Sequence, residues 1–156
     1  MEHSYYLKRA IVLAINSVEH HHGGPFGAVI VKDNQIIGEG YNQVTRLLNP
    51  TLHAEIMAIE NACQTIQHFS LEGATIYSSC QPCPMCEAAI YWARIKQVFF
   101  AATKEDANTF CFDDRHIKDQ LNCNPDERVI HFEKLEMPES LNPFILWSKK
   151  TNRIFY

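Results

Sequence analysis

The stretch from Ala74 to Ala102 limits the fold more than any other part of this 156-residue sequence. Two apolar, β-rich runs, Ala74–Ser79 and Gln97–Ala102, flank a segment with the apolar spacing of a helix. Pro82 and Pro84 suit the first turn of that helix, where a missing N–H leaves no hydrogen bond unmade. Two neighbouring strands joined through a helix run parallel. The sequence therefore predicts an α/β fold.

The remaining periodic segments add helices and strands on either side of this unit. Ser4–His20 has the spacing of a helix, and Phe26–Lys32 with Gln35–Tyr41 reads as a β-hairpin. The later elements that we expect are a helix over His53–Thr65, a loop or short helix around Asp113–Leu121, a strand near Val129–Leu135 and a helix around Pro143–Lys149. No repeat or linker separates them, so residues 1–156 are predicted to form one domain, a mixed sheet with helices on both faces.

Charge and composition disfavour several classes of protein. The chain has 18 acidic and 14 basic side chains, so a nucleic-acid partner is disfavoured. Its apolar runs are far shorter than the ~18 residues that a membrane span requires, and we expect no membrane association. Residues 1–6 lack the pattern of a secretion signal, which favours the cytoplasm and reduced thiols for the six cysteines.

Two short motifs carry residues typical of a metal site. His53–Glu55 and Pro82–Cys86 each lie at the start of a predicted helix. Cys83 and Cys86 are three residues apart, so their sulfur atoms share one helix face, and a helix N-terminus favours thiolates. Zn²⁺ binds a mixture of imidazole and thiolates, and three protein ligands leave a fourth position for water. We therefore predict a zinc site formed by His53, Cys83 and Cys86.

Glu55 is the acid–base group that this predicted site needs. Two thiolates neutralise the charge of the ion, so water is acidified less than at a three-histidine site and a nearby base is required. Residues two apart on a regular helix point to opposite faces. His53 and Glu55 can therefore share a site only if they lie at the N-terminal end of the helix, where the backbone is not yet regular. The order H-x-E followed by P-C-x-x-C is the pattern of zinc nucleobase deaminases.

Two non-enzymatic interpretations of the same cysteines remain open. Cys80, Cys83, Cys86 and His53 together would close a structural zinc site, which leaves Glu55 without a role. A strand followed by C-x-x-C also describes a thioredoxin-like redox module, but that module uses neither the histidine nor the glutamate. The zinc content of the protein and an assay for disulfide cleavage distinguish these interpretations from a hydrolase.

Beyond the zinc motifs, Gly23–Asp33 resembles the cytidine deaminase-like superfamily. Ala89–Arg94, Phe112–Asp114 and the terminal Phe155-Tyr156 are similar to the bacterial guanine deaminases within it, and the resemblance covers almost the whole chain. It implies a three-layer α/β/α fold with a mixed five-stranded sheet, one Zn²⁺ per subunit, and hydrolysis of guanine to xanthine and ammonia in purine metabolism. It also implies a homodimer that exchanges the C-terminal segment, about residues 137–156.

The resemblance assigns polar contacts with the substrate to three further positions. Asn42 would hydrogen-bond the base, Asp114 would recognise it or assist proton transfer, and the backbone of Ala54 would help to position the ring. Simpler interpretations stay open, since an asparagine after a strand is typical of a turn and Asp113-Asp114 can cap a helix at Arg115. Gln81 departs from the glutamate that relatives often place there, and we expect it to tune the site from beside the ligands.

Apolar contacts are implied for three aromatic residues. Phe26 and Trp92 would form walls of the pocket, and Tyr156 would close the site of the partner subunit. A phenylalanine in a β-run and a tryptophan on a helical stripe are also typical of a core. The apolar tail Ile154–Tyr156 follows a polar stretch, and apolar residues at a chain end need a surface to cover.

The spacing of the zinc motifs does not fix the substrate. The same motifs occur in tRNA adenosine deaminases, and a cytosine or triazine substrate is also compatible with them. The acidic balance argues against RNA. We therefore predict a zinc-dependent aminohydrolase that acts on guanine, with these other bases as alternatives.

Overall fold

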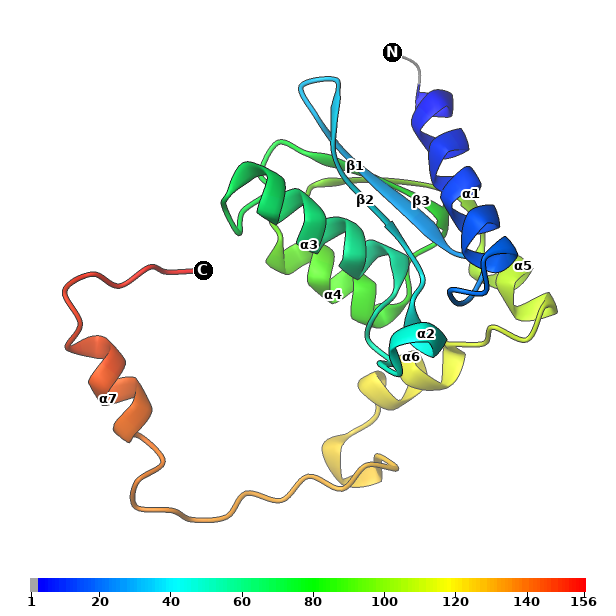
Figure 1. The fold of residues 1–156 in the computed structure, drawn as a ribbon. Helices are drawn as coiled ribbons and strands as arrows, with labels where there is room; N and C mark the ends of the chain where they lie inside the picture. The colour runs from blue at the N-terminus through cyan, green and yellow to red at the C-terminus, as the bar shows by residue number, and fades with distance from the viewer. Residues whose placement is uncertain (1–2) are drawn as a thin grey trace. The chain divides into compact units, whose positions relative to one another are not determined.

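The computed structural model describes residues 3–156, and the chain divides into two compact units, Met1–Arg115 and His116–Tyr156. The first unit holds a sheet whose strands follow the order β2-β1-β3-β4 (Figure 1). These strands are β1 (Gly27–Lys32), β2 (Gln35–Tyr41), β3 (Thr75–Cys80) and β4 (Gln97–Ala102). The single domain expected over residues 1–156 stays a prediction.

The pairing of the strands confirms the two strand units expected from the sequence. β1 pairs antiparallel with β2, as a hairpin requires, and also antiparallel with β3. β3 and β4 are parallel and are joined through α4 (Pro84–Trp92), which is the predicted β-α-β unit. β4 therefore lies at one edge of the sheet, directly after the helix that carries the cysteine motif.

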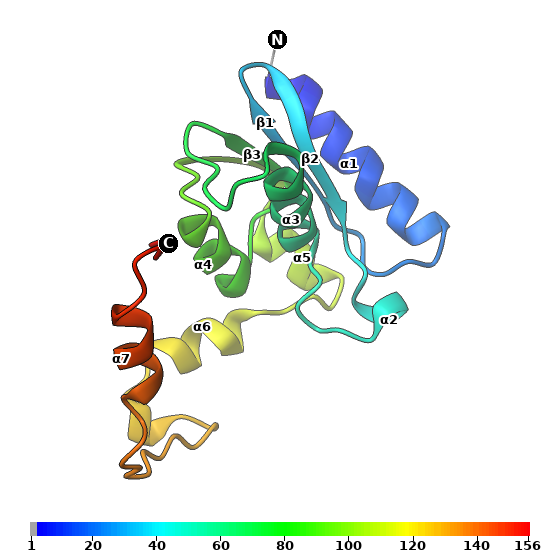
Figure 2. The same ribbon diagram turned by 60° about the vertical axis from the view of Figure 1, so that its left-hand side comes forward.

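Helices cover both faces of this sheet and make three layers (Figure 2). α1 (His3–Glu19) packs on one face, where Ala10 and Leu13 join a core cluster with Val29. α3 (Ala54–Ile66) lies on the other face with α4, and the side chains between this helical layer and the sheet form a second cluster. The three-layer α/β/α arrangement predicted from the sequence is confirmed.

Two glycines of β2 allow α3 to lie very close to the sheet. A Cβ atom at Gly40 would stand 2.2 Å from the carbonyl oxygen of Ala54, and one at Gly38 would stand 2.4 Å from that of Ala58. Only glycine fits such an approach of backbone to backbone, because the helix cannot yield without moving as a whole. The position of the first turn of α3, which carries His53 and Glu55, thus depends on these glycines.

We expect Gly40→Ala to lower the free energy of unfolding by about 1–3 kcal/mol, the usual cost of overpacking a close contact. The added methyl group would push against the backbone of α3, which cannot rotate away as a side chain would. Urea unfolding at fixed zinc concentration measures the change. Gln35→Ala, at an exposed position of the same strand, is the control. Equal stability of the two variants would show that α3 is not held by this contact.

Several short helices complete the two units. α2 (Val44–Leu47) and α5 (Lys104–Thr109) were not expected from the sequence. α5 begins with a capping box, in which Thr103 and Asp106 satisfy each other's backbone N–H groups, and this T-x-x-D spacing is a signal that could have found it. The second unit contains α6 (Arg115–Asn122), a 3₁₀ turn over Pro125–Glu127, and α7 (Asn142–Ser148), which confirms the two late helices predicted.

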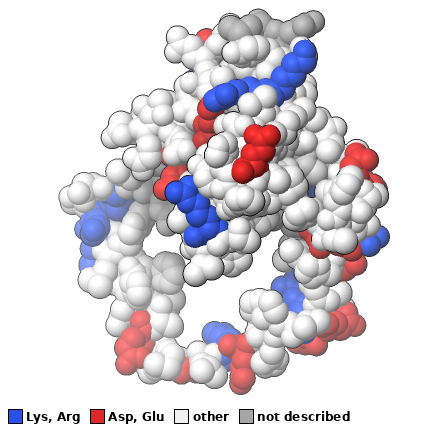
Figure 3. Space-filling view, turned by 45° about the vertical axis from the view of Figure 1, so that its right-hand side comes forward, with Lys and Arg blue, Asp and Glu red and all other residues white. Residues whose placement is uncertain are grey.

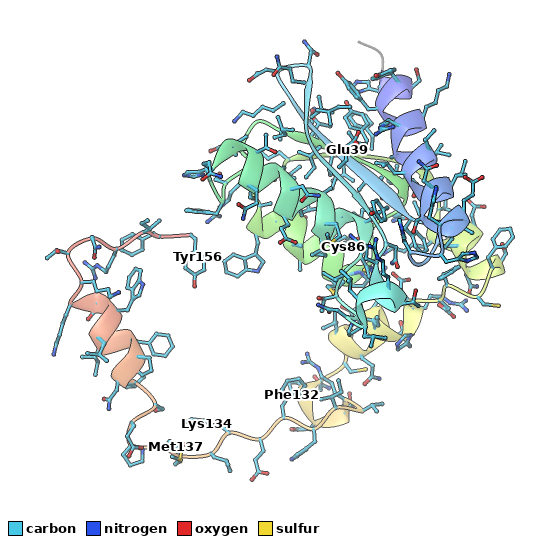
Figure 4. All side chains as sticks on the ribbon, viewed as in Figure 1. Glu39, Cys86, Phe132, Lys134, Met137 and Tyr156 are labelled. Atoms are coloured by element: carbon cyan, nitrogen blue, oxygen red, sulfur yellow. The ribbon has the colours of Figure 1, made fainter. Side chains whose placement is uncertain are left out.

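The predicted fifth strand near Val129–Leu135 is wrong for this chain, and the sheet has four strands instead of five. The stretch is irregular, and Phe132, Lys134 and Met137 follow one another along it towards α7 (Figure 4). Alternating apolar residues favour an extended chain, but a strand also needs a neighbouring edge to bond its backbone. The N–H of Val129 donates instead to the Gln120 side chain, at 2.6 Å.

None of the helices within residues 3–156 has both the length and the apolar character needed to cross a membrane.

Candidate metal centre

One imidazole and two thiols converge where α3 and α4 begin. The Nδ1 atom of His53 lies 3.5 Å from the sulfur of Cys83 and 3.6 Å from that of Cys86. The three potential ligand atoms all lie within 4.8 Å of one another. Figure 4 shows Cys86 at the end of the helical layer where α3 starts. Among residues 3–156, no other three His, Cys, Asp or Glu side chains form such a group.

The local structure explains how two separate motifs reach one point. His53 is the N-cap residue of α3 and Cys83 the N-cap residue of α4, both with extended backbone. Serine, threonine, aspartate or asparagine at this position typically stabilise a helix by ~0.5–2 kcal/mol through a side-chain hydrogen bond. Neither His53 nor Cys83 makes that bond. Both side chains are therefore available for binding a ligand, and both helix N-termini favour negative charge there.

The donor set and its spacing fit a zinc ion. Zn²⁺ binds imidazole nitrogen at 2.0–2.1 Å and thiolate sulfur near 2.3 Å, so tetrahedral ligands of these kinds lie about 3.6 Å apart. The two nitrogen-to-sulfur distances, 3.5 and 3.6 Å, agree with this value. Cys80 is outside the cluster, because its thiol donates to the carbonyl oxygen of Thr103 at 3.5 Å. The cluster thus offers three ligands rather than a closed set of four.

The charges of the cluster suit a cation. A hydrogen bond from Cys86, and a further one with His53, lower the pKa of the Cys83 thiol to about 4. The same bond to Cys83, together with burial, raises the pKa of Cys86. The hydrogen bond with Cys83 raises the pKa of His53, and the charges of Glu55 and Asp114 add to this increase. The Cys83 thiol therefore ionises readily, and the thiolate is the form of cysteine that binds a metal ion.

Glu55 lies buried beside the cluster, in the first turn of α3. The hydroxyl of Ser78, on β3, donates to its Oε1 atom at 3.0 Å. Burial raises the pKa of Glu55, and the hydrogen bonds from its own backbone and from Ser78 oppose this increase. A buried carboxyl group next to a cluster of metal-binding type is typical of a proton-transfer site.

The side-chain oxygen of Asn42 holds a turn of the backbone, and its side-chain nitrogen can bind another partner. Its side-chain oxygen accepts hydrogen bonds from the backbone N–H groups of Gly24, at 3.0 Å, and Val44, at 3.2 Å. Backbone N–H groups only donate, so the atom that they meet is the oxygen of the amide. The Asn42 amide nitrogen is consequently the end that can donate to a ligand. The turn interpretation of this residue is confirmed, and its hydrogen bond to a base stays a prediction.

The loop before α6 places two aspartates in different surroundings. Within the Asp113-Asp114 pair expected to cap the helix, Asp113 accepts the backbone N–H of Arg115 at 3.0 Å. Asp114 lies 3.8 Å from the ammonium group of Lys104 and is about one-fifth exposed. The charge of Asp114 is among those that raise the pKa of His53.

The apolar residues expected around a substrate are only partly brought together. Phe26 packs edge-on against Phe112, with ring centres 5.0 Å apart, and sequence reasoning had given Phe112 no role in the site. Trp92 is 65% exposed at the far end of α4, about 9 Å along the axis from Cys86. Ala54 is fully buried in the first turn of α3. Tyr156 belongs to the second unit, and its role stays a prediction, as does that of Trp92.

Comparison with known proteins agrees with this geometry. Residues 1–102 match the family described as the cytidine and deoxycytidylate deaminase zinc-binding region. The chain belongs to this zinc deaminase family. Family membership and the His53, Cys83 and Cys86 cluster together indicate zinc as the metal.

Two groups of deaminases within the family resemble the chain to different extents. It is 47% identical to the guanine deaminase of Bacillus subtilis strain 168 over 156 residues, the whole of both chains. The crystal structure of guanine deaminase from Bacillus subtilis superposes with a TM-score of 0.96 and covers 100% of this chain and 99% of that one. A tRNA-specific adenosine deaminase of Aquifex aeolicus is 40% identical over 102 residues, 65% of this chain and 67% of that protein. Of these two likenesses, the one to guanine deaminase includes the whole C-terminal unit, and the one to the tRNA-specific adenosine deaminase does not.

Proposed function

We propose that this deaminase hydrolyses guanine to xanthine and ammonia, as a cytoplasmic enzyme of purine metabolism with one zinc ion per subunit. The observation that carries the proposal is the 47% identity to a guanine deaminase over all 156 residues, well beyond the zinc motifs. The cluster of His53, Cys83 and Cys86 supports the metal site, since its donor atoms and their spacing fit zinc.

The zinc ion, when bound, supplies Lewis-acid activation of water. Glu55 accepts a proton from the attacking water, whose oxygen forms a bond to the amine-bearing carbon of guanine. The carboxyl group gives this proton to the ring nitrogen, then takes the remaining proton from the newly bound hydroxyl and gives it to the departing amine; the carbon–oxygen double bond forms as the carbon–nitrogen bond breaks and ammonia leaves. Burial of Glu55 supports this role, because it keeps bulk water from exchanging the proton in transit.

The residues around the cluster offer complementary contacts for a purine. The Asn42 amide nitrogen would donate to an acceptor of the base; the two backbone N–H groups bound by its oxygen support this orientation of the amide. Asp114 would accept from an N–H group of the ring, and the backbone of Ala54 would position the ring. Phe26 and Trp92 would supply apolar walls.

A panel of bases tests this proposal. The zinc-loaded protein is incubated with guanine, adenine, cytosine, their nucleosides and ammeline, and the released ammonia is measured. Guanine is expected to give the highest kcat/KM and xanthine as its product. Release of ammonia from adenine or cytosine, with none from guanine, would overturn the choice of substrate.

Deamination of adenosine in tRNA is the second candidate, favoured by the 40% identity to a tRNA-specific adenosine deaminase. The charge of the chain disfavours it, since 18 acidic side chains outnumber 14 basic ones. Figure 3 shows one face, on which acidic and basic side chains are interspersed rather than gathered into one basic patch. A gel shift with tRNA at low salt tests this candidate, and we expect no shifted band.

Exposed apolar side chains support a homodimer that exchanges residues 137–156. No residue of the described unit His116–Tyr156 is buried, and Phe144, Phe155 and Tyr156 are each more than 70% exposed. Many exposed apolar side chains on one segment are typical of an interface, and a second copy of the chain is the partner that exchange of an identical segment requires. In this arrangement Tyr156 closes the site of the partner subunit.

Complementation in trans tests the exchange. A chain ending at Arg153 is expected to keep zinc but to lose about tenfold in kcat/KM, a loss that corresponds to ~1.4 kcal/mol for the contacts that Tyr156 would make in the partner's site. Refolded with a Glu55→Gln chain, which has an inactive centre and an intact tail, it should recover about a quarter of the wild-type activity through mixed dimers. A mixture no more active than its separate components would show that each tail serves its own subunit, or none.

A further inference from the structure

We propose that Ser78 is a positioning residue that holds the Glu55 carboxylate in the orientation needed for proton transfer. The inference rests on the proposed function, because it assigns Glu55 the movement of protons. It concerns a residue of β3 that belongs to neither zinc motif.

Contact between the two side chains is direct and shielded from water. The Ser78 hydroxyl donates to Oε1 of Glu55 at 3.0 Å, and the two residues are 1% and 6% exposed. A hydroxyl hydrogen bond to a carboxyl oxygen fixes the direction in which that group points. Burial removes the water that would otherwise compete for the same oxygen.

The strand makes Ser78 a rigid support. Ser78 lies opposite Ala28 of β1 and Phe100 of β4, so backbone pairing fixes it on both sides. Side chains alternate along a strand, and Ser78 shares the α3 face of the sheet with Ile76, which packs in the cluster beneath that helix. A hydroxyl on this strand therefore sets the position of a flexible glutamate on the facing helix.

The hydrogen bond from Ser78 to one carboxyl oxygen of Glu55 leaves the other oxygen to transfer protons. With Oε1 bound to Ser78, Oε2 is the atom that exchanges protons with water, ring nitrogen and amine. Proton transfer requires heavy atoms within about 2.6–3.2 Å, and a misplacement of ~1 Å can lower a rate about 100-fold. Loss of the hydroxyl should therefore lower kcat while substrate binding and the metal ligands are kept.

The neighbouring serine provides a matched control. Ser79 is also buried, but its hydroxyl accepts the backbone N–H of Gly27 at 3.0 Å and does not contact Glu55. Removing either hydroxyl deletes one buried hydrogen bond from the same strand. A structural effect would thus appear in both variants, whereas an effect on proton transfer would appear in one.

The experiment compares zinc-loaded wild type, Ser78→Ala, Ser78→Thr and Ser79→Ala on the base that the wild type deaminates fastest. Ser78→Ala is expected to lower kcat by about 10–100-fold, with KM within about threefold and zinc content unchanged. Ser78→Thr keeps a hydroxyl and should recover most of kcat, and Ser79→Ala should keep kcat within about twofold. If Ser78→Ala does not fold, Ser78→Cys keeps the volume, weakens the donor and should also lower kcat.

A double-mutant cycle identifies the partner of Ser78. In a Glu55→Gln background, Ser78→Ala should cause little further loss, because the group that it positions no longer transfers protons. Three outcomes would each overturn the proposal. The Ser78→Ala variant could keep the wild-type kcat, Ser79→Ala could lose as much kcat as Ser78→Ala, or Ser78→Ala could lower kcat by the same factor in the Glu55→Gln background as in the wild type. The identity of the wild-type substrate tests the proposed function separately, and a wild type inert on every base would overturn both.

Discussion

Replacement of Glu55 by glutamine is expected to lower kcat by about 10²–10⁴-fold while the fold and the zinc content are kept. The amide has the shape of the carboxylate, and its oxygen can still accept from the Ser78 hydroxyl, but it cannot take up and release a proton. Because burial raises the pKa of Glu55, the folded state disfavours its charged form. The neutral amide removes this penalty, so the variant should be at least as stable as the wild type near neutral pH.

Ammonia release, zinc content and thermal unfolding of the Glu55→Gln variant check these expectations together. Glu60→Gln is the matched control, since it makes the same change at an exposed position of the same helix. We expect the control to keep wild-type turnover. Near-normal turnover in Glu55→Gln would mean that another group moves the protons.

The parts of the fold that could be predicted are those whose signals are local. The proline pair before α4 and the apolar runs around it predict the β-α-β unit, and Asp33-Asn34 predicts the hairpin turn. The residues His53, Cys83 and Cys86 were expected at two helix starts, and the structure places these starts together. These predictions depend on the spacing of residues that are close in sequence, because a helix or a turn fixes the relative positions of such residues.

The features that could not be predicted depend on partners distant in sequence. Val129–Leu135 has the pattern of a strand, but a strand exists only where another edge bonds it, and no spacing reports that. Ser78 looks like any serine in a strand, and its importance appears only when α3 brings Glu55 above it. The sequence offers both Asp113 and Asp114 as caps at Arg115, and only the structure shows that Asp113 accepts the backbone N–H of Arg115.

Loss of a metal ligand should have the other large effect. Cys86→Ala is expected to lower the zinc content to near zero and to abolish ammonia release, because the His53 nitrogen and the Cys83 sulfur that remain no longer complete the set that fits zinc. It should also lower the free energy of unfolding, since a ligand present at 100 times its Kd stabilises the native state by ~2.7 kcal/mol. A chelator applied to the wild type should cause the same loss, and added zinc should reverse it.

Cys80→Ala distinguishes a catalytic centre from a closed structural zinc site. Cys80 is buried, as Cys86 is, but its thiol donates to Thr103 and lies outside the cluster. The variant should therefore keep zinc and turnover and lose only a small part of its stability. Loss of zinc in Cys80→Ala would make that sulfur a fourth ligand, and a centre with four protein ligands has no position for the water that hydrolysis consumes. Retained zinc in Cys86→Ala would instead place the metal elsewhere. The two cysteines, six residues apart, thus decide between a hydrolytic and a structural role for the metal.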